Sequence, residues 1–288
     1  MITKINPSLL NKAVRFATKM NQNEETRSSF LSTKRSFIHK DFLQLMEHAD
    51  HLLIGSFNPS NLDGLIACFK QPHQDYMDCA GPFFTDPSKA KILITEIQER
   101  THHKRHLLFF FDHRHQILID VIQSLGGLIQ GTESQLLLKR GQEVNLVQKG
   151  QINEFQEHES YWLKETHNLL FPEGYIPIDD VIKQLDPTRK TLVVYDHENP
   201  VGYLILKSYP DFLQRKTIEM VGVLEKYRHS GYGKSLLSYA INKSFQDPSV
   251  QSIDLIVENI NTHALNLYTH LGFSVKRKNV NMIIPRKE

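Results

Sequence analysis

The stretch of sequence that decides the fold is TIEMVGVLEKYRHSGYGKSLLSYA, residues 217–240. Its first eight residues are mostly β-branched or apolar, as in a buried strand, and its last residues place Leu236 and Ala240 on one side of a helix. A tight turn with Gly231 and Gly233 separates the two. A strand, a turn and a helix start aim free backbone N–H groups at one point, where the helix dipole also favours negative charge. The segment therefore predicts a site for a diphosphate.

Three kinds of anion-binding turn compete for this segment. A dinucleotide-binding turn needs GxGxxG directly after the strand, and that spacing is absent. A P-loop needs GxxxxGK[ST], but Arg228 occupies the position of the first glycine and puts a bulky side chain where the loop must turn. The third pattern is RxxGxG, in which glycines remove the Cβ atoms that would hold a phosphate away from the backbone. Arg228 or Lys234 can add charge-assisted contacts. We favour this third pattern.

The RxxGxG pattern of Arg228, Gly231 and Gly233 resembles the coenzyme A-binding motif of the GNAT superfamily of N-acetyltransferases. The surrounding VGVLEKYRHSGYGKSLL is similar to the signature of that family. Two residues depart from it: Glu225 stands where the family often has proline, and His229 where it often has glycine. Neither departure removes a backbone donor.

A second motif follows after a predicted strand, in the stretch ENINTHALNLYTHLGF, residues 258–273. It resembles the GNAT pattern N-x-x-A-x-x-L-Y-x-x-x-G-F, which is matched by Asn261, Ala264, Leu267, Tyr268, Gly272 and Phe273. A tyrosine on an amphipathic helix is usually an ordinary core residue. Two motifs in the family's order, with a strand between them, instead favour a functional tyrosine. The resemblance covers roughly residues 143–285.

The resemblance implies that acetyl-CoA is the cosubstrate and that a small-molecule or peptide amine is the acceptor. Direct transfer would occur in a groove between two diverging parallel strands, Thr217–Leu224 and Ile253–Glu258. The pantetheine arm would follow the first strand, with the Val223 N–H as donor to the thioester oxygen. The cofactor-binding residues that it implies are Val221, Val223, Arg228, His229, Ser230, Gly231, Tyr232, Gly233, Lys234, Ser235 and Asn261.

Two residues are candidates for catalysis. Tyr268 would protonate the leaving thiolate, although full proton transfer from a phenol to a thiolate is uphill by about 2 kcal/mol at ordinary pKa values. Glu219 is the candidate base, because a period of two puts it on the same face of its strand as Val221 and Val223. The alternative is a carboxylate that is paired with a lysine or meets solvent at the start of the strand. Residues available for the acceptor wall are Tyr161, Trp162, Phe171, Glu173, Tyr175 and Asp179.

The order of predicted elements occurs twice, and 288 residues are enough for two domains. Asp78-Cys-Ala-Gly81 matches Glu219-Met-Val-Gly222, and Leu125-Gly126 matches Leu271-Gly272. We expect an α/β (α+β) protein of two tandem GNAT-like domains, residues 1–141 and 142–288. Each domain would have a mixed, mostly antiparallel sheet with a parallel central pair and flanking helices. The second domain would begin with a strand at Val144–Gln148 and a helix at Asn153–Leu169.

The first copy lacks the residues that carry the chemistry. FTDPSKAK, residues 84–91, replaces the glycine turn, Ile122 stands in place of Tyr268, and His115 replaces Asn261. We therefore expect a degenerate copy with a structural or substrate-shaping role. Five histidines flank one strand there, but without a regular ligand spacing, so no metal site is expected.

Composition disfavours several other classes of protein. The net charge of +2 is too balanced for a nucleic-acid surface, and no run of about 18 apolar residues suggests a membrane span. Two cysteines make no disulfide framework, and no signal peptide is evident, so a cytoplasmic enzyme is expected. A homodimer is compatible with the sequence. The competing hypothesis is a non-catalytic acyl-CoA sensor or interaction module.

Overall fold

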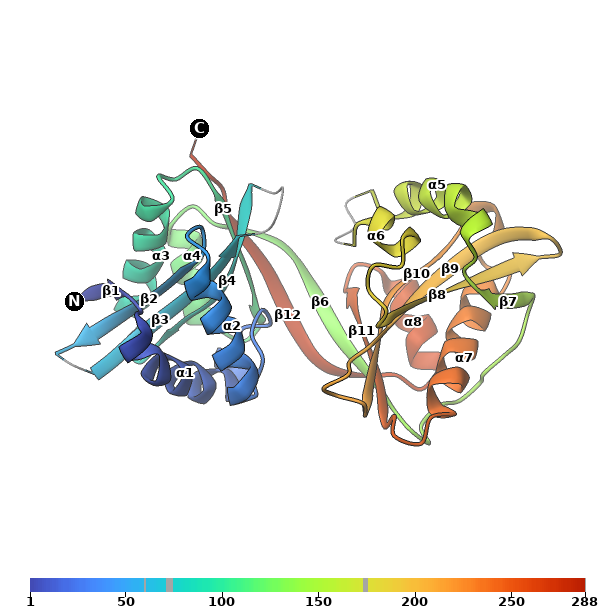
Figure 1. The fold of residues 1–288 in the computed structure, drawn as a ribbon, viewed down its shortest axis with the longest axis horizontal. Coiled ribbons are helices and arrows are strands. Elements are labelled where there is room, and N and C mark those ends of the chain that lie inside the picture. The colour runs from blue at the N-terminus through green and yellow to red at the C-terminus, as the bar shows by residue number, and fades with distance from the viewer. Residues whose placement is uncertain (60, 71–74, 173–175, 288) are drawn as a thin grey trace. The chain divides into compact units, whose positions relative to one another are not determined.

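The computed structural model describes the chain except residues 60, 71–74, 173–175 and 288. The chain forms two compact units (Figure 1). One unit comprises Met1–Glu133 together with Arg277–Glu288, and the other comprises Ser134–Lys276. No helix of the described chain is long and apolar enough to cross a membrane.

The first unit is a sheet with helices on both faces. Its strand order is β1-β2-β3-β4-β5-β12, and within its described residues only β4 and β5 pair in parallel. Helices α1 and α2 pack on one face, and α3 and α4 pack on the other. The elements are β1 (Ile2–Lys4), α1 (Pro7–Gln22), η1 (Glu24–Thr26), α2 (Arg35–Glu47), β2 (Leu52–Asn58), β3 (Asn61–Lys70), β4 (Tyr76–Phe84), α3 (Ser88–Arg100), β5 (His106–Asp112), α4 (Gln116–Ser124) and the C-terminal part of β12 (Ser274–Ile284).

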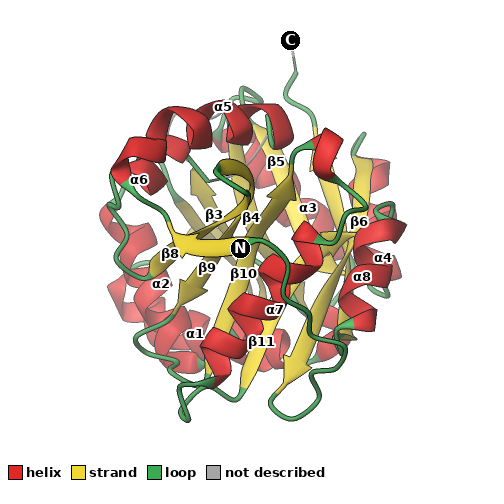
Figure 2. Ribbon diagram, turned by 90° about the vertical axis from the view of Figure 1, so that its right-hand side faces the viewer, coloured by secondary structure: helices red, strands yellow, loops and turns green. Residues whose placement is uncertain are grey.

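The second unit repeats this arrangement (Figures 1 and 2). Its strand order is β6-β11-β10-β9-β8-β7, with β10 and β11 parallel and the pairs from β10 to β7 antiparallel. Helices α5 and α6 pack on one face, and α7 and α8 on the other. The elements are β6 (Leu128–Lys139, in part), β7 (Gln151–Glu154), η2 (Glu157–Glu159), α5 (Ser160–Leu170), α6 (Ile178–Ile182), β8 (Arg189–Asp196), β9 (Asn199–Ser208), β10 (Arg215–Val223), η3 (Glu225–Tyr227), α7 (Tyr232–Phe245), β11 (Ser252–Glu258) and α8 (Thr262–His270).

The last strand of each sequence repeat belongs to the sheet of the other repeat. Strand β12 pairs antiparallel with β5 through Asn279–Ile284, and β6 lies next to β11. The division of the chain therefore differs from the expected contiguous one at residues 141 and 142. An exchanged strand has the same apolar alternation as one that stays with its own repeat, so the sequence pattern does not distinguish the two.

The two repeats agree in their last helix. Helices α4 and α8 both have nine residues and begin after His115 and Asn261, respectively. Both are followed by a glycine with positive φ, Gly126 at 83° and Gly272 at 98°. At Gly272 a side chain is excluded, because a Cβ atom would lie 2.1 Å from the Gln142 carbonyl oxygen. The repeat is thus a repeat of structure as well as of sequence.

The start of the second repeat differs from the prediction. Residues 144–148 form no strand. They pass the end of α8, where the Val144 N–H donates to the Leu271 carbonyl at 3.3 Å, and then α7, where the Val147 N–H donates to Ser238 Oγ at 3.1 Å. The first strand is β7, which pairs with β8, and α5 begins at Ser160 rather than at Asn153. Strand β7 lies at the edge of the sheet and pairs with β8. Edge strands often carry polar residues, so the polar sequence around Gly150 shows no apolar pattern from which this strand could be predicted.

Candidate active site

The parallel strands β10 and β11 separate part-way along their length. They pair from Arg215 to Ile218 on β10, although both strands continue beyond this ladder. A β-bulge between Ile218 and Met220 in the ladder with β9 marks the point of separation, as expected from the extra twist that a bulge adds. The predicted diverging strands are present.

The separation leaves one edge of β10 open. The Leu224 N–H donates to the Val201 carbonyl on β9 at 2.9 Å. Because backbone groups alternate in direction along a strand, Val221 and Val223 direct their N–H and C=O groups away from β9, towards β11. A pocket of about 660 Å³ lies here, and both valines line it.

The turn before α7 exposes a run of backbone amides. His229 and Gly231 adopt left-handed conformations, with φ of 60° and 90°. Among the described residues, the N–H groups of residues 229–234 have no hydrogen-bond acceptor. The flanking amides are used: the Arg228 N–H donates to the Glu225 carbonyl at 3.0 Å, and the Ser235 N–H to the Gly231 carbonyl at 2.9 Å. The expected group of donors is therefore present but ends one residue before Ser235.

Most predicted cofactor residues line this one pocket. Those that do are Val221, Val223, Arg228, His229, Gly231, Tyr232, Gly233, Lys234 and Asn261. Ser230 and Ser235 are not among them. Ser235 is fully buried, and its Oγ accepts from the Lys149 N–H at 2.8 Å, so its hydroxyl supports the fold. The pocket also contains Leu170, Tyr227 and His263, which the sequence patterns did not single out.

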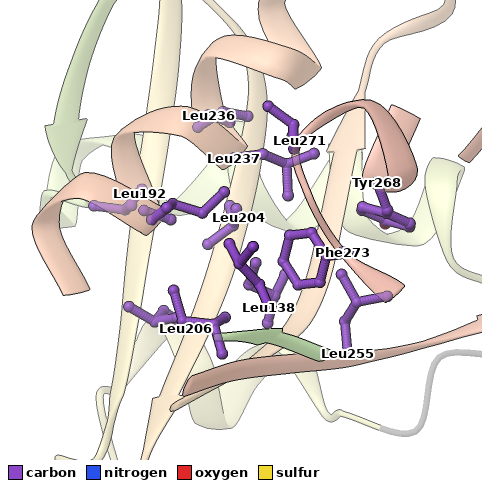
Figure 3. Packing of buried hydrophobic residues seen from close by; sticks show 14 of the residues in the cluster. Leu138, Leu192, Leu204, Leu206, Leu236, Leu237, Leu255, Tyr268, Leu271 and Phe273 are labelled. Atoms are coloured by element: carbon purple, nitrogen blue, oxygen red, sulfur yellow. The ribbon is translucent and has the colours of Figure 1, made fainter. Parts of the chain in front are cut away.

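Tyr268 lines the same pocket from α8. Its ring packs in the core beneath α7 and α8, edge-on to Phe273 with ring centroids 5.9 Å apart (Figure 3). Burial raises the pKa of Tyr268 to about 12, so its phenol stays protonated at neutral pH. Within the described residues its hydroxyl has no hydrogen-bond partner. The group is therefore free to donate to a molecule in the pocket.

Glu219 does not reach the pocket. Its carboxylate is held by the Arg189 guanidinium, with Nε–Oε2 at 2.6 Å and Nη2–Oε1 at 3.2 Å. The expected common face with Val221 assumed unbroken alternation, but the bulge between Ile218 and Met220 interrupts it. The carboxylate is paired, as in the alternative, but its partner is an arginine and not the expected lysine.

Cations surround the turn. Arg228 and Lys234 line the pocket, and the Arg228 Nε donates to the Val223 carbonyl at 3.1 Å. The Lys149 Nζ donates to the Ser230 carbonyl at 2.6 Å. Of the described residues that line the pocket, none carries a carboxylate. The pocket is thus suited to an anionic ligand.

The opposite wall comes from the end of α5. Leu170 and Phe171 approach Gly222 so closely that a Cβ there would lie 2.7 Å from the Leu170 Cδ1. Of the other residues expected for an acceptor wall, Tyr161 is 80% exposed, and Trp162 packs against the core beneath α5. The Asp179 carboxylate binds the Lys164 ammonium at 2.8 Å, which also lowers the Asp179 pKa. Glu173 and Tyr175 lie outside the described residues.

Comparison with known proteins agrees with this geometry. The model of the acetyltransferase (GNAT) family matches residues 153–273. An "N-alpha-acetyltransferase" of Sulfurisphaera tokodaii is 32% identical over 117 residues, which are 37% of this chain and 70% of the relative.

The chain belongs to the GNAT family.

It is accordingly an acyltransferase. Solved structures show that the fold extends over both units. A GCN5-related N-acetyltransferase from Sphaerobacter thermophilus superimposes with a TM-score of 0.74 at 14% identity, over 100% of this chain and 96% of that one. A tandem GNAT protein from the clavulanic acid biosynthesis pathway gives 0.67 at 10% identity, over 99% and 98%. The expected tandem GNAT fold is confirmed.

The corresponding groove of the first GNAT unit is filled by its own chain. Strands β4 and β5 pair only from Tyr76 to Cys79 on β4. Beyond this ladder, the Ser29 N–H donates to the Phe110 carbonyl at 2.7 Å, and the Asp112 N–H to the Arg27 carbonyl at 3.2 Å. Because β12 covers the other edge of β5, residues 27–29 occupy the edge that faces β4. The edge of β5 that faces β4 is therefore already bonded; in the second unit it corresponds to the edge of β11 that faces β10.

Among the described residues, no cluster of three His, Cys, Asp or Glu side chains is arranged to hold a metal ion. Two of the histidines at the ends of β5 have other partners. His106 Nδ1 accepts from the Arg286 N–H at 3.2 Å, and His115 is buried against Phe84 and Phe111. Desolvation by burial lowers the His115 pKa.

Proposed function

We propose that the unit Ser134–Lys276 transfers an acetyl group from acetyl-CoA directly to a primary amine. The observation that carries this proposal is one pocket that combines three features: the turn of residues 229–234, whose amides have no acceptor among the described residues and of which all but Ser230 line the pocket; the open edge of β10; and the Tyr268 side chain. These three features suit the diphosphate, the pantetheine arm and the thioester, respectively.

Acetyl-CoA would bind mainly through backbone groups. The amides of residues 229–234 would surround the diphosphate, with charge-assisted contacts from Arg228 and Lys234. The amide-rich pantetheine arm would extend the sheet along the open edge of β10 at Val221 and Val223. The Val223 N–H would donate to the thioester oxygen, which gains negative charge as the amine attacks.

Tyr268 would assist the departure of the thiolate. The amine nitrogen bonds to the carbonyl carbon and the C–S bond breaks; in balance, the nitrogen loses one proton and the sulfur gains one. With a phenol pKa of about 12 and a thiol pKa near 8.5, full transfer is uphill by about 5 kcal/mol. The phenol therefore acts by hydrogen bonding to the sulfur as its charge develops. Burial of the thiolate in the same apolar pocket raises the pKa of the thiol and so reduces the difference between the thiol and phenol pKa values.

The acceptor that fits best is an α-amine. With Glu219 bound to Arg189, and no carboxylate among the described lining residues, the pocket offers no evident strong base. An α-amino group has a pKa near 8 and is partly neutral at physiological pH, whereas a lysine side chain near 10.4 is not. The name of the Sulfurisphaera tokodaii relative, "N-alpha-acetyltransferase", supports the same choice.

The test is a panel of amines in which thiol release from acetyl-CoA is measured. The panel holds peptides with a free N-terminus, the same peptides with a blocked N-terminus and a free lysine, single amino acids, polyamines and aminoglycosides. We expect thiol release with free N-termini and little with the blocked peptides. Activity confined to blocked peptides or polyamines would contradict the α-amine assignment, and no release from any acceptor would contradict the transferase.

We further propose that only the second unit binds the cosubstrate. Residues 27–29 occupy the equivalent groove of the first unit, and Ile122 there is buried in the core without a hydroxyl. Titration calorimetry should give one acetyl-CoA per chain. Two equivalent sites per chain would show that the first unit also binds acetyl-CoA. That result would contradict the proposal that this unit binds no cosubstrate.

A further inference from the structure

Two histidines meet at the pocket where the amides converge. His229 belongs to the turn before α7, and His263 to the first turn of α8. Their ring centroids are 4.9 Å apart with the planes at 65°, and both residues line the pocket. Elements far apart in the sequence thus bring two imidazoles beside the same group of unpaired N–H donors.

His229 occupies a backbone position that suits glycine. Its φ of 60° lies in the left-handed region, which is unfavourable for a residue with a Cβ atom. Residues other than glycine with a strained backbone are concentrated at ligand-binding sites. We therefore infer that a histidine is present here because its imidazole contacts a ligand.

The charges around the pair favour an anion. The permanent cations that line the pocket are Arg228 and Lys234, and the Lys149 ammonium lies against the Ser230 carbonyl. The Asp196 carboxylate accepts from the Tyr232 hydroxyl at 2.6 Å and does not line the pocket. The other titratable groups that line it are the phenols of Tyr227, Tyr232 and Tyr268. The fixed positive charges and the backbone N–H donors of the turn both suit a diphosphate.

We propose that His229 and His263 form a pH-dependent clamp that takes up a proton when the diphosphate of an acyl-CoA binds between the amides. This inference rests on the proposed use of acetyl-CoA. Its sign follows from linkage: a ligand that favours the protonated imidazole binds more tightly as pH falls through the histidine range, near 6.5. The clamp therefore adds affinity at mildly acidic pH that the backbone amides alone do not supply.

The experiment compares acetyl-CoA dissociation constants at about pH 8 and about pH 6 for wild type, His229→Gly, His263→Gln and His270→Gln. His270 is the matched control. It lies on α8, as His263 does, but outside the pocket, and its Nδ1 is 2.6 Å from the Asn266 carbonyl oxygen. His229→Gly removes the imidazole and relieves the left-handed backbone, so it should fold at least as well as wild type.

We expect wild type and His270→Gln to bind at least about fivefold more tightly at the lower pH. His229→Gly and His263→Gln should lose most of that gain, and calorimetry in buffers of different ionisation enthalpy should show less proton uptake. The 3′-phosphate of coenzyme A also titrates near pH 6, but it does so equally in all four proteins, so the difference between variants decides. Identical pH profiles for all four proteins would overturn the clamp.

A second ligand shows which phosphate group of coenzyme A the two histidines contact. With 3′-dephospho-acetyl-CoA the pH-dependent gain should persist, because the diphosphate remains. Loss of the gain with this ligand would move the contact to the 3′-phosphate and contradict the assignment. If wild type binds and turns over acetyl-CoA, but the pH dependence of its affinity is the same as in the histidine variants, the clamp is contradicted and the proposed function is not. If wild type binds no acetyl-CoA at either pH, the proposed function fails with it.

Discussion

Gly233→Asp should lower the affinity for acetyl-CoA by at least about 100-fold, or roughly 2.7 kcal/mol, while the unit stays folded. Gly233 is the second residue of α7, and its amide is one of the six without an acceptor among the described residues. A Cβ there has room, since its nearest neighbour, Val223 Cγ2, lies at 3.6 Å. The added carboxylate would stand on the pocket side, where we place the diphosphate, and repel it.

The same carboxylate should not destabilise the fold. An acidic residue in the first turn of a helix interacts favourably with the helix dipole, by about 0.3–1 kcal/mol. The melting temperature of Gly233→Asp should therefore equal or exceed that of wild type. Gly233→Asn is the control of equal size without the charge and should lose much less affinity. Equal losses in Gly233→Asp and Gly233→Asn would mean that space, rather than charge, is decisive.

Tyr268→Phe should reduce kcat about 100-fold, within the usual range for loss of a general acid, and leave acetyl-CoA binding unchanged. The phenyl ring preserves the contact with Phe273 and the buried packing (Figure 3). Only the hydroxyl is removed, and it has no partner within the described residues, so no buried group loses a hydrogen bond. A stopped-flow or steady-state thiol assay measures kcat, and calorimetry measures binding. A kcat within twofold of wild type would show that the Tyr268 hydroxyl has no role in the reaction.

The turn and its two flanking elements were predictable because the information is local. A run of β-branched and apolar residues defines β10, and glycines at 231 and 233 permit a turn that few other residues allow. The observed strand and α7 lie within two residues of their expected bounds. The Tyr268 motif is local in the same way, since its helix stop at Gly272 fixes the end of α8.

What the sequence did not predict depends on pairing between distant strands. The bulge that turns Glu219 towards Arg189 arises in the ladder with β9, and no residue pattern within β10 marks it. The exchange of β6 and β12 leaves each strand's own alternation unchanged. His263 joins the pocket only because α8 packs beside the turn that carries His229. One signal was available: a histidine replaces a usual glycine at 229.

The central claim is that the amides of residues 229–234 receive a diphosphate. A crystal structure of the chain with acetyl-CoA tests it most directly. The account predicts diphosphate oxygens within about 3.2 Å of at least two of these N–H groups, with the thioester beside Val223 and Tyr268. A cosubstrate whose phosphates lie elsewhere on the chain, with these amides untouched, would contradict it.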